Sequence, residues 1–189
     1  EFEMISLVCT IINRFNLQNC SIKINHLGTK ENKHAFCDAL VKYLQPFKDS
    51  LDNKDLQRLS KNPLRVLDSK SIKTQELLKN APSIKDFIDK TSINLLRSIQ
   101  NEFSDLCNIE IDYSLVRGLD YYSGFVFEAI SSELGAQDSF LGGGRYDHLC
   151  KKLGGKDLPS IGMALGIERF ADLVSIDAPS RKIVSFLVV

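Results

Sequence analysis

Two arginines occupy positions where their side chains could bind an anion. Arg117 precedes Gly118 at the mouth of a predicted strand, and Arg169 lies in the first turn of a predicted helix. A guanidinium presents five donors in a rigid fork that suits a carboxylate or a phosphate, and glycine lets backbone approach a ligand closely. A cation in the first helical turn opposes the helix dipole, a conflict that a bound anion such as a nucleotide phosphate would resolve. The local alternative for Arg117 is a surface salt bridge.

Tyrosines and glycines accompany these arginines. Tyr121 and Tyr122 are adjacent on a predicted strand, so their side chains should face opposite sides of the sheet. Three glycines, residues 142–144, end another predicted strand, and Tyr146 follows them. Backbone without Cβ atoms can lie directly against a small ligand, or it can form a β-bulge. The glycines match neither the G-x-G-x-x-G pattern nor a P-loop, because no Lys-Ser or Lys-Thr follows them.

Hydrophobic periodicity predicts the elements that must position these residues. The first part of the chain is predicted to be mainly helical, with helices over 4–17, 29–46, 53–60, 72–79, 83–89 and 92–106 and one strand over 21–25. After residue 108 the pattern changes to strands at 109–113, 121–130, 138–141 and 161–165, followed by a helix over 166–174. The sequence therefore predicts an α+β fold, with a helical block inserted into a domain built on an antiparallel sheet.

Composition excludes several classes of protein. The 189 residues, 43% of them apolar, fit one medium domain or two small ones, and 24 basic against 24 acidic residues exclude a wholly basic nucleic-acid coat. No stretch approaches the roughly 20 apolar residues of a membrane helix, and no secretory signal is present, so we expect a soluble, cytoplasmic chain without a membrane partner. Five cysteines without a C-x-x-C pair and three scattered histidines predict reduced thiols and no metal site. Because the chain begins without Met and ends in an apolar run at 183–189, we expect a piece of a longer protein.

Four segments, in this order and spacing, resemble the histidyl-tRNA synthetase family of class II aminoacyl-tRNA synthetases. Residues 117–128 resemble the histidine-binding signature, R-G-L-D-Y-Y followed by V-F-E, and residues 142–147 resemble the glycine-rich loop. Residues 162–169 resemble motif 3, G-x-x-x-G-x-E-R, and residues 62–70 resemble a signature between motifs 2 and 3. No segment resembles motif 1 or motif 2, so we expect the later half of a catalytic core, which cannot form histidyl-adenylate alone.

The resemblance implies ATP-dependent activation of histidine to histidyl-adenylate, followed by transfer to tRNA(His). Arg117 would be the catalytic cation that meets both histidine and ATP, and Arg169 would bind ATP. The implied histidine pocket consists of Arg117, Tyr121, Tyr122, Gly143, Gly144 and Tyr146. ATP is the implied co-substrate, with Mg²⁺ by analogy, and the full-length protein would be a homodimer. We expect these side chains to converge on one cavity.

The resemblance also implies a domain plan and leaves two rivals. Residues 1–29 would follow motif 2 in the catalytic core, 30–108 would be a helical insertion domain, 109–178 would return to the core, and 179–189 would begin the anticodon-binding domain. One rival is a regulatory paralogue, such as the regulatory subunit of ATP phosphoribosyltransferase; the other is a synthetase-like domain that senses uncharged tRNA. Both arginines and the complete insertion block argue against the regulatory subunit.

Overall fold

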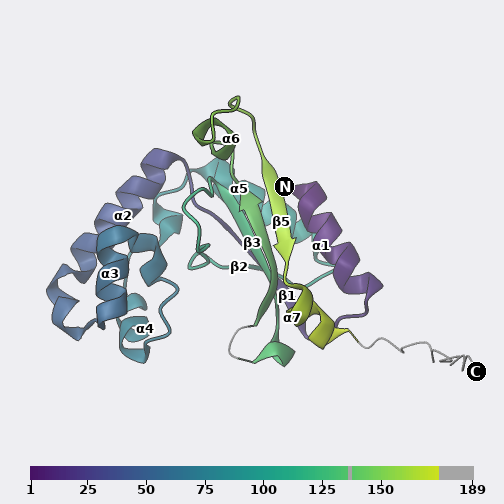
Figure 1. The fold of residues 1–189 in the computed structure, drawn as a ribbon, viewed down its shortest axis with the longest axis horizontal. Helices are drawn as coiled ribbons and strands as arrows, with labels where there is room; N and C mark the ends of the chain where they lie inside the picture. Colours follow the sequence, from purple (N-terminus) through teal and green to yellow (C-terminus); the bar gives the residue numbers. More distant parts are fainter. Residues whose placement is uncertain (136–137, 175–189) are drawn as a thin grey trace, which may run out of the picture.

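The computed structural model describes residues 1–135 and 138–174 and contains a five-stranded sheet flanked by helices (Figure 1). The strands lie in the order β2-β1-β3-β4-β5, with bounds β1 (Cys20–His26), β2 (Ile109–Ile111), β3 (Phe125–Ser131), β4 (Ser139–Arg145) and β5 (Ile161–Leu165). Three of the four strand pairs are antiparallel, which confirms the predicted α+β fold. β2 instead pairs parallel to β1, because the long helical segment between them carries the chain back to the starting end of the sheet.

Six helices lie close to their predicted positions: α1 (Phe2–Arg14), α2 (Lys30–Leu44), α3 (Asn53–Lys61), α4 (Ile72–Leu78), α5 (Lys90–Phe103) and α7 (Ile167–Leu173). The short helix α6 (Leu149–Lys152) was not predicted. Thr29 caps α2: its hydroxyl accepts from the Asn32 amide, and the Asn32 side chain accepts from the Thr29 amide. The helix predicted at 83–89 is wrong in extent, since only a short 3₁₀ turn, η3 (Ile84–Asp86), forms after Pro82.

Two hydrophobic cores lie on opposite sides of the sheet. The first contains α1, α5 and the sheet face that carries Phe125 and Phe127. The second contains α2, α3, the 3₁₀ turn η2 (Pro63–Val66) and the segment before β3. Figure 1 shows α2, α3 and α4 together on the side of the sheet away from α1. α5 belongs with the first core, so it packs apart from the other helices of residues 30–108; the domain boundaries themselves stay a prediction.

Two local predictions are wrong in ways that affect the site. The strand expected from Tyr121 starts only at Phe125, because Gly124 has a positive φ of 76° that an extended strand cannot continue. The glycines expected to end a strand lie inside β4, paired with β3 on one side and β5 on the other.

Within residues 1–135 and 138–174, no helix has the length and apolar character needed to span a membrane. The expectations for residues 175–189 fall outside the described residues.

Candidate functional site

The guanidinium of Arg117 lies directly on the backbone of Gly142. A Cβ atom added to Gly142 would come within 2.5–2.6 Å of three guanidinium atoms, so only glycine leaves room for the arginine. Arg117 also forms an ion pair through Nη1 with Glu128 of β3, which is the strand partner of Gly142. The β3–β4 pair therefore provides both the floor and the counter-ion that hold Arg117 on one face of the sheet.

Glu128 and Ser139 connect Arg117 to Arg169. The Ser139 side chain lies close enough to Glu128 to act on its pKa, and the Ser139 carbonyl oxygen accepts from Arg169 Nη1 at 2.5 Å. Burial raises the pKa of Glu128 above its ordinary value, although Arg117 and Ser139 act in the opposite direction. Glu128, which pairs with Arg117, and Ser139, which accepts from Arg169, thus bring the two arginines to neighbouring parts of β3 and β4. The sequence left Glu128, the glutamate of V-F-E, either to orient a tyrosine or an arginine or to make a structural hydrogen bond; in the structure it pairs with Arg117 and shares its strand face with Val126.

The Nε atom of Arg117 is buried and has no hydrogen-bond partner within the described residues. A buried donor without an acceptor costs about 1–3 kcal/mol, so proteins rarely leave one unpaired. The carboxylate of Glu128 engages Nη1 rather than this atom. The guanidinium therefore retains a donor suited to an anionic ligand.

Three tyrosine rings form a cluster beside the arginines. The ring centroids of Tyr121 and Tyr122 lie 4.6 Å apart, and Tyr146 stands edge-on to both at 5.9 and 6.5 Å. The prediction that Tyr121 and Tyr122 face opposite sides of a sheet is wrong, because both precede β3 in a turn. Burial is the main cause that raises the pKa of Tyr122, and its interaction with the Tyr121 side chain raises the pKa further. The Tyr122 hydroxyl therefore keeps its proton at neutral pH.

Glycines also make room for two of these tyrosines. A Cβ on Gly144 would lie 2.9 Å from the Tyr122 ring, and one on Gly162 would lie 2.6 Å from the Tyr146 hydroxyl. Gly144 pairs with Gly162 across β4 and β5 and lies two residues beyond Gly142, so all three share the sheet face of Arg117. Gly143 points the other way, with its missing Cβ 2.3 Å from the Gly162 carbonyl and 2.7 Å from Phe127.

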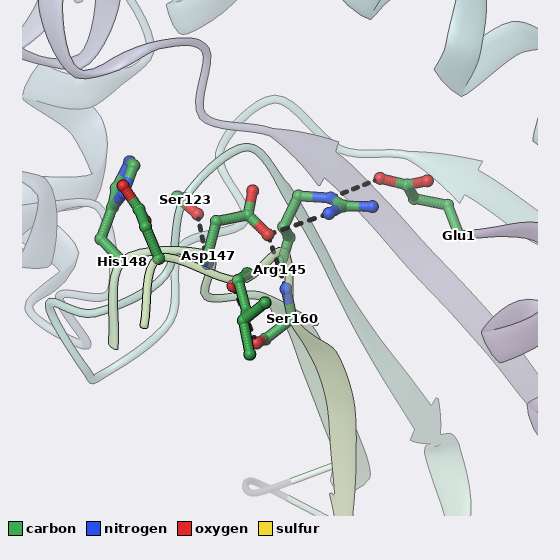
Figure 2. Close-up of polar contacts among 8 residues, drawn as sticks. Glu1, Ser123, Arg145, Asp147, His148 and Ser160 are labelled. Carbon is green, nitrogen blue, oxygen red and sulfur yellow. Dashed lines mark hydrogen bonds and ion pairs between the residues drawn. The ribbon is translucent and has the colours of Figure 1, made fainter. Parts of the chain in front are cut away.

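The turn that carries Tyr146 is fixed by Asp147 (Figure 2). One oxygen of Asp147 accepts from Arg145 Nη1 at 2.9 Å and from the Ser160 amide at 2.8 Å. The Asp147 amide donates to the Ser123 hydroxyl at 3.1 Å, and Arg145 also pairs with Glu1 at 2.7 Å. These bonds join the end of β4, the start of β5 and the tyrosine turn, so the position of Tyr146 depends on all three.

A cavity of about 1000 Å³ opens beside the tyrosines. Tyr121 and Tyr122 line it, together with residues from the start of α2 and from α6, including Lys30, Lys33 and Lys152. Arg117, Arg169 and Tyr146 are not among its lining residues. The structure therefore brings Arg117, Tyr122 and Tyr146 together over the glycine face, with Arg169 at the start of β4, whereas only Tyr121 and Tyr122 open into this cavity.

The described residues hold neither a metal-binding cluster nor a disulfide. Among residues 1–135 and 138–174, no group of three or more His, Cys, Asp or Glu side chains could hold a metal ion. All five cysteines are free, as expected. The chemistry available is thus that of two guanidinium groups, three phenols and a carboxylate held on glycine-rich strands.

Solved structures share this fold. The apo histidyl-tRNA synthetase of S. aureus covers 93% of this chain and 44% of its own, with a TM-score of 0.67 and 29% sequence identity. A structure from Bacillus halodurans, described as an ATP phosphoribosyltransferase regulatory subunit/histidyl-tRNA synthetase, gives a TM-score of 0.59 at 19% identity. At that identity the second likeness concerns the fold alone.

Sequence comparison identifies the family. The histidine–tRNA ligase of Protochlamydia amoebophila is 45% identical over 170 residues, which is 89% of this chain and 40% of that protein. The enzyme of the same name from Picosynechococcus is 43% identical over 178 residues, covering 92% of this chain and 41% of the relative. The chain thus spans about two fifths of these curated relatives. A profile of the family described as Histidyl-tRNA synthetase matches residues 1–170, and the chain therefore belongs to the histidyl-tRNA synthetase family.

Proposed function

We propose that the full-length protein containing this chain is a histidine–tRNA ligase of class II. It would activate histidine with ATP to histidyl-adenylate, release pyrophosphate and transfer the histidyl group to tRNA(His). The observation that carries the proposal is the buried, unpaired Nε of Arg117, held on Gly142 by Glu128. This donor suits the anion that forms when a carboxylate attacks the α-phosphate.

Arg117 would act in the activation step. As the histidine carboxylate attacks the α-phosphate, negative charge builds on the phosphoryl oxygens and the bond to pyrophosphate breaks. A preoriented guanidinium stabilises that charge more than it stabilises the separated substrates, and this difference accelerates the step. The ion pair with Glu128 fixes Nη1, so the fork has little orientation left to lose when the substrates bind.

The tyrosines would recognise the imidazole of histidine. Tyr122 and Tyr146 lie on the glycine floor next to Arg117, and a phenol can donate to one ring nitrogen or accept from the other. Tyr121 supports both rings through its own contacts. Gly144 would contribute by leaving room for the Tyr122 ring beside the ligand, while Gly143 would contribute by close packing of β4 on β5 from behind.

Arg169 would bind ATP from the start of α7. Its position next to Ser139 lets it stack on an adenine ring and meet the triphosphate, combining cation–π contact with charge. We also propose that ATP carries Mg²⁺ to the site, since the described residues hold no cluster of His, Cys, Asp or Glu that could bind the ion. We further propose that tRNA(His) is the acceptor of the histidyl group, that the full-length protein is a homodimer and that it acts in the cytoplasm.

The test is histidine-dependent ATP–pyrophosphate exchange in the full-length protein. Arg117→Ala should lower the exchange rate by about 100-fold or more, because it removes a donor made for the transition state. Arg97→Ala, which removes an exposed arginine from α5, is the matched control and should leave the rate unchanged. An unchanged rate in a folded Arg117→Ala variant would remove this residue from the mechanism.

Two further results discriminate between the proposal and its rivals. The 189-residue chain alone should show no exchange, and exchange by it would refute the expected dependence on the rest of the protein. Histidine binding by the full-length protein without any exchange would favour a regulatory paralogue instead.

A further inference from the structure

Residues 62–70, which link α3 to α4, have no role in the proposed chemistry, yet they pack against the segment that carries Arg117. Leu64 and Val66 are buried in the second core together with Leu115 and Val116, which immediately precede Arg117. Because buried side chains are closely packed, a shift of one segment must be felt by the other. The helical part of the chain and residues 115–122 thus form one packed unit.

Polar contacts also join residues 62–70 to the residues that follow Arg117 in the sequence. Asn62 Nδ2 donates to a carboxylate oxygen of Asp120. One terminal nitrogen of Arg65 lies 4.0 Å from the position that a Cβ atom on Gly118 would occupy. Residues from 62–70 therefore contact the arginine segment both before and after Arg117.

Asp68 adds charge to the same arrangement. The cations nearest to its half-buried carboxylate include Arg58, Arg65 and Arg117. Burial raises the pKa of Asp68, whereas these cations act in the opposite direction, and Asp68 in turn acts on Glu128. Arg117 therefore lies in the field of two carboxylates, Glu128 from the sheet and Asp68 from the helical block.

A buried carboxylate anchors the far end of the segment. Asp55 is 1% exposed and accepts hydrogen bonds from the Ser69 hydroxyl and from the Thr74 hydroxyl at 2.7 Å, and Arg58 pairs with it at 3.0 Å. Since every one of these partners is satisfied inside the helical block, the backbone next to Asp68 is held rigidly. Residues 62–70 are thus held firmly enough to fix the position of residues 115–122, which they contact.

We propose that residues 62–70 position Arg117 for the activation step: the helical block holds residues 115–122 by the Asn62–Asp120 hydrogen bond and the shared core, and thereby fixes the catalytic guanidinium. This inference rests on the proposed function of Arg117. The residues named act through Arg117 and touch no substrate themselves.

Exchange of the two hydrogen-bonding partners provides the test. In the full-length protein, Asn62→Asp places two carboxylates against each other, while aspartate preserves the capping preference at position 62. Asp120→Asn with Asn62→Asp restores a hydrogen bond with the donor and acceptor exchanged. We expect Asn62→Asp to lower kcat for ATP–pyrophosphate exchange by about tenfold with little change in KM, because displacement of a catalytic group by a fraction of an ångström weakens transition-state contacts. The double variant should recover most of the loss.

Hydrogen–deuterium exchange gives a second measurement that does not depend on activity. Residues 115–122 should exchange faster in Asn62→Asp and return toward the original rate in the double variant. Glu76→Gln, which removes an exposed carboxylate paired with Lys79 on α4, is the control and should change neither measurement. Unchanged exchange of residues 115–122 in Asn62→Asp, or a double variant no better than the single one, would overturn the inference. Full activity of Arg117→Ala would instead overturn the proposed function. The hydrogen–deuterium exchange of residues 115–122 would still test whether the Asn62–Asp120 contact holds this segment in place.

Discussion

Adding a single methyl group at position 142 should disable Arg117 without unfolding the protein. Gly142 has no positive φ, so alanine can adopt its backbone conformation. The new Cβ would start 2.5 Å from Arg117 Nη1, whereas ordinary contact begins near 3.4 Å. The guanidinium must therefore move by about 0.9 Å, the difference between these two distances, and it is the flexible end of a side chain that yields rather than the sheet.

The displacement would stretch the ion pair with Glu128 and misalign the remaining donors. A misplacement of about 1 Å can cost on the order of 100-fold in rate, which corresponds to about 2.7 kcal/mol of transition-state stabilisation. Histidine-dependent ATP–pyrophosphate exchange by the full-length Gly142→Ala protein should fall by that factor, while its melting temperature changes by only a few degrees. A folded variant with the original exchange rate would show that the contact between Arg117 and Gly142 has no part in activation.

Three further outcomes follow from neighbouring positions. Gly143→Ala should destabilise the fold itself, seen as a large drop in melting temperature, because its Cβ would meet the backbone carbonyl of Gly162 at 2.3 Å; a normal melt would contradict this packing. Tyr146→Phe should raise KM for histidine by about five- to tenfold with kcat nearly unchanged, since one ligand hydrogen bond is lost; an unchanged KM would exclude the hydroxyl from recognition. Burial lowers the pKa of His26, against the opposing charges of Asp89 and Glu1, so its unfolded form binds the proton more readily. The free energy of unfolding should therefore fall as pH drops below about 6.5, and melting curves of His26→Gln should lack that part of the decline.

Elements with strong local signals could be predicted from the sequence. The cap at Thr29 and the apolar spacing of α1 predicted helices close to those observed, because both signals depend on neighbouring residues. The parallel pairing of β2 with β1 could not be derived in this way. It joins Ile22 to Ile109 across the whole helical segment, and only tertiary packing decides the direction.

The tyrosine turn shows where periodicity misleads. An apolar run from Tyr121 to Ile130 looks like one strand, yet Gly124 interrupts it, and its φ of 76° turns Tyr121 and Tyr122 off the strand line. The pair Ser123-Gly124 was the available signal for this turn. For Glu128 the sequence allowed a role in orienting an arginine or a tyrosine but could not name the partner, because only the sheet register brings Arg117 to the face that Glu128 shares with Val126.

The glycines of β4 and β5 give a more general rule for this sheet face. Glycine is a poor strand former, so our sequence reasoning ended a strand at Leu141 instead of continuing it to Arg145. The structure gives the reason for keeping glycine inside strands: an added Cβ would meet Arg117 at Gly142, Tyr146 at Gly162, and both the Phe125 carbonyl and the Tyr122 ring at Gly144. Each glycine thus accommodates one side chain proposed to bind substrate, and each of those side chains comes from outside the strands. A rigid sheet supplies the floor while the turns and the segment before β3 supply the chemistry, which is why a glycine on this face marks the site more reliably than the charged residues alone.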